Sequence, residues 1–226
     1  MTTPPPAPGA PVAKNRGLGC LGCGCLILVL LVLLFVGLIG GACYWTYHKA
    51  AKLTSATPST VQTFDGGDAL YQGATQKLTA FDQALQQHQP ATLRLSADEI
   101  NTQIARDRDF ADNNIHVFLT MIDDKADMQI SFPTNALQVN LFSGRYVNGE
   151  ISFGMNFDPT SKTLNFVLHG LHLANQEVPK NILPTLQNEL APAINQLLQK
   201  DPECQKILNQ AKSIEIKDGV LIIEIQ

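Results

Sequence analysis

The chain has 226 residues, 45% of them hydrophobic, with 16 Lys and Arg against 20 Asp and Glu. This length supports one core of ordinary size, and the composition excludes a wholly disordered or collagen-like chain. Residues 1–52 hold four basic and no acidic side chains, which leaves 12 basic and 20 acidic ones, a formal charge of −8, in residues 53–226. Because an acidic surface repels phosphates, this charge argues against a nucleic-acid partner.

The first 48 residues divide into a head and an apolar segment. Residues 1–17 are rich in Pro, Ala, Gly and Thr, a composition typical of a disordered head. Residues 18–48 lack Asp, Glu, Lys and Arg and contain the run LILVLLVLLFVGLI at 26–39. A helix needs about 20 such residues to cross about 30 Å of hydrocarbon. The segment therefore predicts a single-pass signal-anchor in the lipid bilayer, with a cytoplasmic head and an extracytoplasmic remainder, as in a bacterial envelope protein.

Cysteines near the apolar run leave alternatives open. The sequence GGAC at 40–43 fits the cleavage site of a lipoprotein or of an export signal, and either would also export the rest of the chain. A cluster of cysteines before the apolar run is best interpreted as close packing of small side chains, with reversible acylation and a zinc site as alternatives. It consists of Cys20, Cys23 and Cys25. Because Cys204 is the only cysteine beyond Cys43, no intrachain disulfide is expected in the exported part.

Residues 49–60 are expected to form a linker to a single extracytoplasmic domain over 61–226. Apolar side chains at alternating steps of three and four indicate that this domain begins with a helix that ends near Pro90. They are Tyr71, Ala74, Leu78, Phe81 and Leu85. Such a stripe packs on its own domain, which is the commoner case, or against a second chain as a short stalk.

A strand over 92–95 and a helix that begins at Ala97 are expected next, because Ser96 and Glu99 have the spacing of a capping box. The acidic residues of this region suit the first turns of helices, where they interact favourably with the helix dipole. They are therefore interpreted as structural residues and not as catalytic carboxylates.

After this helix the apolar period changes to two, which indicates strands. Segments 115–122 and 125–132 pair about an Asp-Asp turn with their alternating apolar residues on one face. Residues 163–173 predict another strand, with a β-bulge near Gly170 where the apolar parity shifts. Two more hairpins are predicted by the turn dipeptides Asn148-Gly149 and Asp218-Gly219.

A long helix follows the strand over 163–173 and is expected to cover the sheet. Its apolar residues at helical spacing are Ile182, Leu186, Leu190, Ala193, Ile194 and Leu197. Pro192 should kink it, because proline cannot donate a helical hydrogen bond. The expected fold class is α+β, with a curved antiparallel sheet of about seven strands covered on one face by two or three helices.

No residue pattern indicates catalysis, a metal or a cofactor. His169 and His172 are three apart in a predicted strand, so they point to opposite faces unless a bulge intervenes. A group of three aspartates resembles a fragment of a calcium loop, but the glycine and the closing glutamate of such a loop are missing, so a polar turn explains the group better. It consists of Asp123, Asp124 and Asp127. We expect a protein that is not an enzyme.

Several short segments occur in an order that matches a known layout. They are the apolar anchor, LSADEINTQIA, GRYVNGE, VPKNILPTLQNEL and IKDGVLIIEI. Residues 93–225 thereby resemble small membrane-anchored bacterial proteins of uncharacterised function of the YpmS type. The helix opening that carries the resemblance here consists of Leu95, Ser96, Ile100 and Asn101. The resemblance implies an envelope role with lipid or lipid-like ligands, although Asn101 also suits a bond to backbone where the helix meets the sheet.

Two functions are therefore expected for the exported domain. As a binding module it holds a lipid or another apolar ligand in a slot between sheet and helix. The expected lining residues are Phe142, Phe153, Phe166 and Leu186. As an interaction or scaffold module it has a fully packed core and contacts an envelope protein through an apolar surface. The candidate contact residues are Phe118, Arg145, Val147, Tyr71, Leu78 and Phe81.

Overall fold

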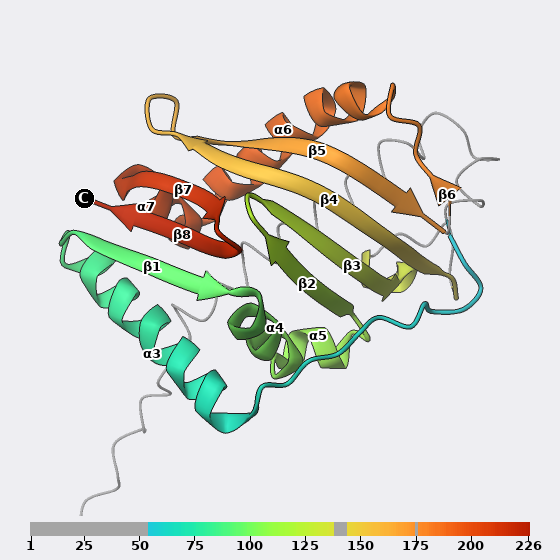
Figure 1. Ribbon diagram of the computed structural model, residues 1–226, viewed down its shortest axis with the longest axis horizontal. Coiled ribbons are helices and arrows are strands. Elements are labelled where there is room, and N and C mark those ends of the chain that lie inside the picture. The colour runs from blue at the N-terminus through green and yellow to red at the C-terminus, as the bar shows by residue number, and fades with distance from the viewer. Residues whose placement is uncertain (1–53, 138–143, 175) are drawn as a thin grey trace, which may run out of the picture.

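The structure is a computed structural model that describes residues 54–137, 144–174 and 176–226 (Figure 1). The predicted head, anchor and cysteine cluster lie outside these residues, as do Cys43 and Phe142. Within the described ranges, no helix has both the length and the hydropathy needed to cross a membrane.

The described chain folds into two antiparallel sheets and several helices, which confirms the predicted α+β class. The strands are β1 (Ala91–Ser96), β2 (His116–Ile122), β3 (Lys125–Pro133), β4 (Tyr146–Asp158), β5 (Thr163–Leu173), β6 (Gln176–Glu177), β7 (Ala211–Lys217) and β8 (Val220–Ile225). The helices are α3 (Gly67–Gln86), α4 (Ala97–Ala105), α5 (Arg108–Asp112), α6 (Leu183–Lys200), α7 (Pro202–Gln210) and the 3-10 helix η2 (Thr134–Leu137).

The prediction of one sheet of about seven strands is wrong. One sheet has the order β1-β8-β7 and the other the order β2-β3-β4-β5-β6. The first strand of the described chain pairs with the last, and this pairing of distant segments carries no local sequence signal. The two sheets meet where β7 lies against β4 (Figure 1).

The hairpins β2–β3 and β7–β8 are confirmed with their predicted registers. Val117 lies opposite Ile130 in the first hairpin, and Ile216 lies opposite Leu221 in the second. In both hairpins the apolar side chains of one parity are buried, because a shift of one residue would turn all of them toward solvent.

The hairpin predicted at Asn148-Gly149 is wrong, because β4 passes through both residues and pairs them with Ser131 and Ile130 of β3. A type I′ turn needs positive φ at both central residues, and neither has it. The buried Asn148 side chain accepts a hydrogen bond from Ser131 Oγ at 2.8 Å and donates one to the Thr57 carbonyl oxygen at 2.9 Å. These tertiary bonds hold the dipeptide in an extended strand.

The bulge predicted near Gly170 is confirmed. The register of β4 and β5 shifts between Ser152, which pairs with Gly170, and Phe153, which pairs with Leu168. His169 is therefore the extra residue of β5. The shift lets apolar side chains on both sides of the bulge face the core.

The stripe on α3 packs on its own domain, as expected. Its buried residues are Ala74, Leu78, Phe81 and Leu85. The next helix, α4, begins at the predicted residue, and both bonds of its capping box form. The Glu99 N–H donates to Ser96 Oγ at 3.2 Å, and the Ser96 N–H donates to Glu99 Oε2 at 3.0 Å.

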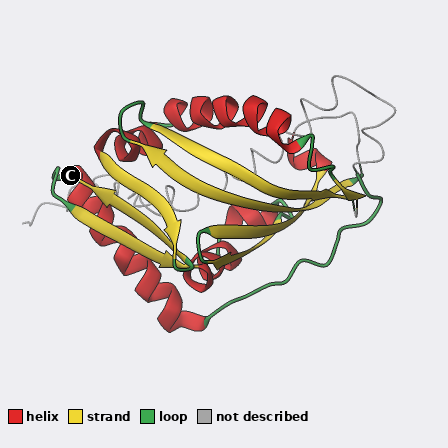
Figure 2. Cartoon of the chain, turned by 45° about the horizontal axis from the view of Figure 1, so that its top comes forward, coloured by secondary structure: helices red, strands yellow, loops and turns green. Residues whose placement is uncertain are grey.

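The helix α6 lies along β5 and covers the five-stranded sheet, as Figure 2 shows. Its buried residues are Leu183, Leu190, Ile194 and Leu198. Three residues of the predicted stripe are instead exposed: Ala193, Ile182 at 42% and Leu197 at 38%. The predicted set combined two neighbouring stripes, and packing against β5 selects the one that follows 3.6 residues per turn. Pro192 lies inside the helix, as predicted.

Residues 54–65 form an extended strap that leads from β4 to α3 (Figure 1). Ser55 forms a β-bridge with Tyr146. Arg145 Nε donates to Thr54 Oγ1 at 2.6 Å, and an Arg145 terminal nitrogen donates to the Thr54 carbonyl oxygen at 2.7 Å. The described part of the expected linker, residues 54–60, is therefore bound to β4.

Candidate binding groove

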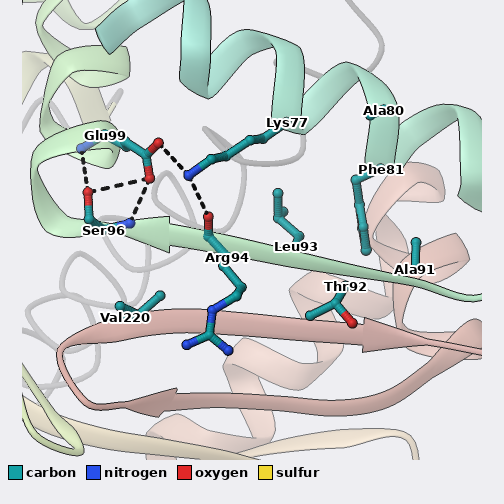
Figure 3. A pocket seen from close by; sticks show the side chains of 10 residues that line it. All are labelled: Lys77, Ala80, Phe81, Ala91, Thr92, Leu93, Arg94, Ser96, Glu99 and Val220. Carbon is teal, nitrogen blue, oxygen red and sulfur yellow. Dashed lines mark hydrogen bonds and ion pairs between the residues drawn. The ribbon is translucent and has the colours of Figure 1, made fainter.

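A groove of about 600 Å³ lies between α3 and β1 (Figure 3). Lys77, Ala80 and Phe81 contribute the helical wall, β1 the opposite wall, and Glu99 of α4 closes one end. The volume falls within the range of ligand sites, about 300–1,000 Å³. It is much larger than the space of about 10 Å³ beside Phe153 and Phe166.

The strand β1 forms the edge of its sheet, and its free edge borders this groove. Lys77 Nζ donates to the Arg94 carbonyl oxygen at 3.3 Å, and the Ser96 N–H donates to Glu99. Both bonds lie outside the sheet. Because the N–H and C=O of one residue in an antiparallel strand point to the same side and successive residues alternate, the main-chain groups of Thr92 also point away from β8.

Three of these outward main-chain groups are open. Within the described part of the chain, no hydrogen bond reaches the N–H or C=O of Thr92 or the N–H of Arg94. Both side chains are exposed. An open strand edge is a template for pairing with another extended chain.

One end of the groove is closed by an ion pair. Lys77 Nζ lies 2.6 Å from Glu99 Oε1, and the two side chains are 48% and 9% exposed. The other Glu99 oxygen accepts the Ser96 N–H, so this carboxylate is committed to the Lys77 ammonium and to the helix cap. The geometry of this carboxylate therefore suits a group that closes the end of the groove and not one that transfers a proton to a ligand.

Arg94 is the remaining charge of the groove. Its side chain points away from Lys77, on the other face of β1 (Figure 3). Among the described residues it takes part in no salt bridge. An extended segment placed beside β1 would therefore meet an available guanidinium on one face and the apolar Phe81 and Leu93 on the other.

The start of α3, the helix that forms the helical wall, is fixed by Arg106, the C-cap residue of α4. Its guanidinium lies 2.9 Å from Asp65 and 2.7 Å from Asp68, and it stacks on the Tyr71 ring at 4.9 Å. The hydrogen bonds from Arg106, followed by one from the Gly67 N–H, lower the pKa of Asp65 below 3.8. Hydrogen bonds to Asp68 and then Asp65 raise the pKa of Arg106.

The slot predicted between sheet and helix is almost filled. Phe153 and Phe166 lie there with ring centroids 6.3 Å apart, next to Leu190 of α6. The space left is about 10 Å³, and a cavity needs about 10–15 Å³ to hold one water molecule. Leu186 is partly buried against the same core. The described residues therefore leave no room for an acyl chain at this place.

The predicted contact residues do not form one surface. Phe118 is half-buried, and Val147 is buried on β4, so its predicted exposure is wrong. Arg145 is engaged with the strap. Leu78 and Phe81 are buried on α3, but Phe81 also borders the groove, so this one predicted residue lies at the candidate site.

Sequence reasoning missed Thr92 and Arg94. The alternation in Ala91–Ser96 shows that both side chains share a polar face, and a charge within a short strand is a device by which natural proteins protect sheet edges. That signal does not show which partner strand β1 takes. The open edge follows only from the pairing with β8.

Other candidate residues lie apart from the groove. His169 and His172 are both exposed. In the described part of the chain, no three His, Cys, Asp or Glu residues are grouped closely enough to hold a metal ion. No protein-family model matches the sequence, and no curated protein matches it significantly. The resemblance of residues 93–225 to the YpmS type therefore stays a prediction.

Proposed function

We propose that this protein is a non-catalytic, membrane-anchored module whose extracytoplasmic domain binds a segment of an envelope protein in the groove between α3 and β1. The observation that carries the proposal is the open main-chain edge of Thr92 and Arg94 beside a groove of about 600 Å³. The anchor over residues 18–48 supports the location, because it would export everything that follows it.

The chemistry of the groove favours a polypeptide over a lipid. An acyl chain offers no partner to main-chain N–H and C=O groups, and each such group costs free energy when it is buried without a hydrogen bond. A peptide segment supplies both donors and acceptors at the required spacing. The two charged side chains of the walls, Lys77 and Arg94, add polar contacts that an acyl chain cannot use.

Photo-crosslinking in the native membrane tests this proposal. The full chain would carry p-benzoylphenylalanine in place of Ala80, which is exposed on the helical wall. A matched control would carry it in place of Glu189, which is exposed on α6. We expect a protein-sized adduct at residue 80 and none at residue 189, with an extracytoplasmic partner identified from the adduct by mass spectrometry.

Three results would contradict the proposal. An adduct of lipid mass at residue 80 would support the apolar-ligand function instead. A cytoplasmic partner would contradict the predicted orientation of the anchor. Irradiation without any adduct at residue 80 would show that the groove holds no partner in the membrane.

A further inference from the structure

On two other strands, a residue whose main chain points out of the sheet is bound by a side-chain amide. The Asn101 amide of α4 donates to the Leu119 carbonyl oxygen of β2 at 2.7 Å and accepts from the Leu119 N–H at 2.8 Å. On the part of β5 that β6 does not pair, the Asn195 amide of α6 forms the same pair of bonds with Leu164, each at 2.8 Å. Each amide replaces the peptide group that a neighbouring strand would offer.

Among the described residues, no side-chain amide binds the outward main-chain groups of β1. Lys77 binds the Arg94 carbonyl oxygen and Glu99 binds the Ser96 N–H, whereas the N–H and C=O of Thr92 and the N–H of Arg94 stay open toward the groove. We infer that the partner segment binds by strand addition, as an extended chain that pairs with β1 and lies between it and α3. This inference rests on the proposed function, because it specifies how the bound polypeptide is held.

The walls also specify the chemistry of that segment. Side chains of an added strand alternate between the two faces of the sheet. Those on one face meet Phe81 and Leu93 and are apolar, whereas the residue opposite Arg94 lies on the guanidinium face and is acidic. The bound segment therefore alternates apolar residues with Asp or Glu.

A second copy of this chain is a poorer occupant than a separate partner. An antiparallel pairing of two β1 edges through Thr92 and Arg94 places the two Arg94 side chains on one face, opposite or diagonal to each other. Like charges in such positions are destabilising. An acidic segment removes this repulsion and supplies the counter-ion that Arg94 lacks among the described residues.

Amide hydrogen exchange of the full chain in detergent micelles, followed by NMR, tests the pairing. The probes are the blocked peptide Val-Glu-Val-Glu-Val, its lysine counterpart Val-Lys-Val-Lys-Val, and the glutamate peptide N-methylated at both glutamates. At millimolar glutamate peptide, exchange of the Thr92 and Arg94 amides should slow at least about tenfold, because both become hydrogen-bonded. The Leu93 and Leu95 amides, which point toward β8, should not change.

Matched variants identify the contacts. Thr92→Pro removes an outward N–H at a position where an edge strand tolerates proline, and it should weaken binding at least about tenfold. Thr92→Val keeps the N–H and should bind within about twofold of the parent chain. Arg94→Glu should reverse the preference from the glutamate to the lysine peptide. The N-methylated peptide leaves the protein unchanged and should not bind.

Several results would overturn strand addition. They are unchanged exchange at Thr92 and Arg94 with millimolar peptide, equal binding of the N-methylated peptide, and a preference of the parent chain for lysine. Protection that rises with protein concentration without peptide would instead assign the edge to a second copy. If photo-crosslinking still yields an envelope protein, the proposed function survives these failures, whereas a lipid adduct removes both proposals.

Discussion

Outward main-chain groups of β5 and of β1 could both pair with another chain, but they are hydrogen-bonded differently. Leu164 on β5 has its N–H and C=O paired with one amide side chain, Asn195, and Gln187 of the same helix accepts the Leu168 N–H at 3.2 Å. On β1 a lysine and a glutamate occupy only one end. Both strands lie beside a helix, so cover by a helix alone does not close an edge.

The helical side chains that bind the two strands also differ in length. An asparagine side chain is short, so it reaches the main chain of a strand only from a helix packed directly against that strand. The space beside Phe153 and Phe166 under α6 is about 10 Å³, whereas the groove between α3 and β1 is about 600 Å³. On β1, the long Lys77 side chain of α3 reaches the Arg94 carbonyl oxygen.

The largest effect is expected from opening the β2 edge. Asn101 and its partner Leu119 are 3% and 4% exposed, so Asn101→Leu leaves two buried main-chain groups without hydrogen bonds. Each unpaired group costs about 1–3 kcal/mol, so the free energy of unfolding should fall by about 2–5 kcal/mol in urea denaturation. The control Asn165→Leu, at an exposed position of β5, should stay within about 0.5 kcal/mol. Equal losses in both variants would show that the amide pair does not stabilise the edge.

A smaller effect is expected from Asn195→Leu, which opens the β5 edge. Its bonds to Leu164 are only partly buried, so the free energy of unfolding should fall by about 1–2 kcal/mol. The open edge should also cause self-association, measured by sedimentation velocity. Asn188→Leu on the exposed side of the same helix is the matched control. A stable, monomeric Asn195→Leu protein would mean that α6 closes the edge by its backbone position alone.

The smallest effect concerns the helical wall of the open groove. The Arg106 hydrogen bonds lower the pKa of Asp65, so their contribution to stability is present above the unfolded pKa, near 3.8, and is lost as the pH falls through the lowered folded value. In Arg106→Gln the Asp65 pKa, followed by NMR of its carboxyl carbon, should rise. The control Arg108→Gln should leave it unchanged, because Arg108 forms no salt bridge among the described residues.

Asp158 serves as an internal reference in that titration. Its pKa is lowered by the Ser161 hydroxyl and then by the Thr160 N–H, without Arg106. A parallel shift of Asp158 and Asp65 in Arg106→Gln would indicate a global change in structure instead of the loss of one ion pair.

Local patterns predicted those elements whose hydrogen bonds close within a few residues. The capping box of Ser96 and Glu99 places the start of α4 correctly, and the Asp218-Gly219 turn places β7 opposite β8. The dipeptide Asn148-Gly149 has an equally strong local signal but fails, because Ser131 and Thr57 bind the asparagine side chain in an extended strand. Tertiary contacts overrode the turn propensity there.

The candidate site could be predicted only in part. Phe81 was assigned to an interaction surface, and it borders the groove. Thr92 and Arg94 could not be identified, because an open main-chain edge is defined by which strands do not pair with it. The closed slot at Phe153 and Phe166 likewise depends on how deeply α6 packs onto β5, and apolar spacing does not determine that depth.

The sequence by itself therefore determined the α+β class, the registers of two hairpins, the bulge near Gly170 and the capping box at Ser96, since each depends on neighbours along the chain. Only the tertiary structure decided that β1 joins β8, that amides bind Leu119 of β2 and Leu164 of β5, and that the outward main-chain groups of Thr92 stay open. These features depend on residues far apart in the chain, whose approach is decided by the packing of the whole core and not by any local pattern.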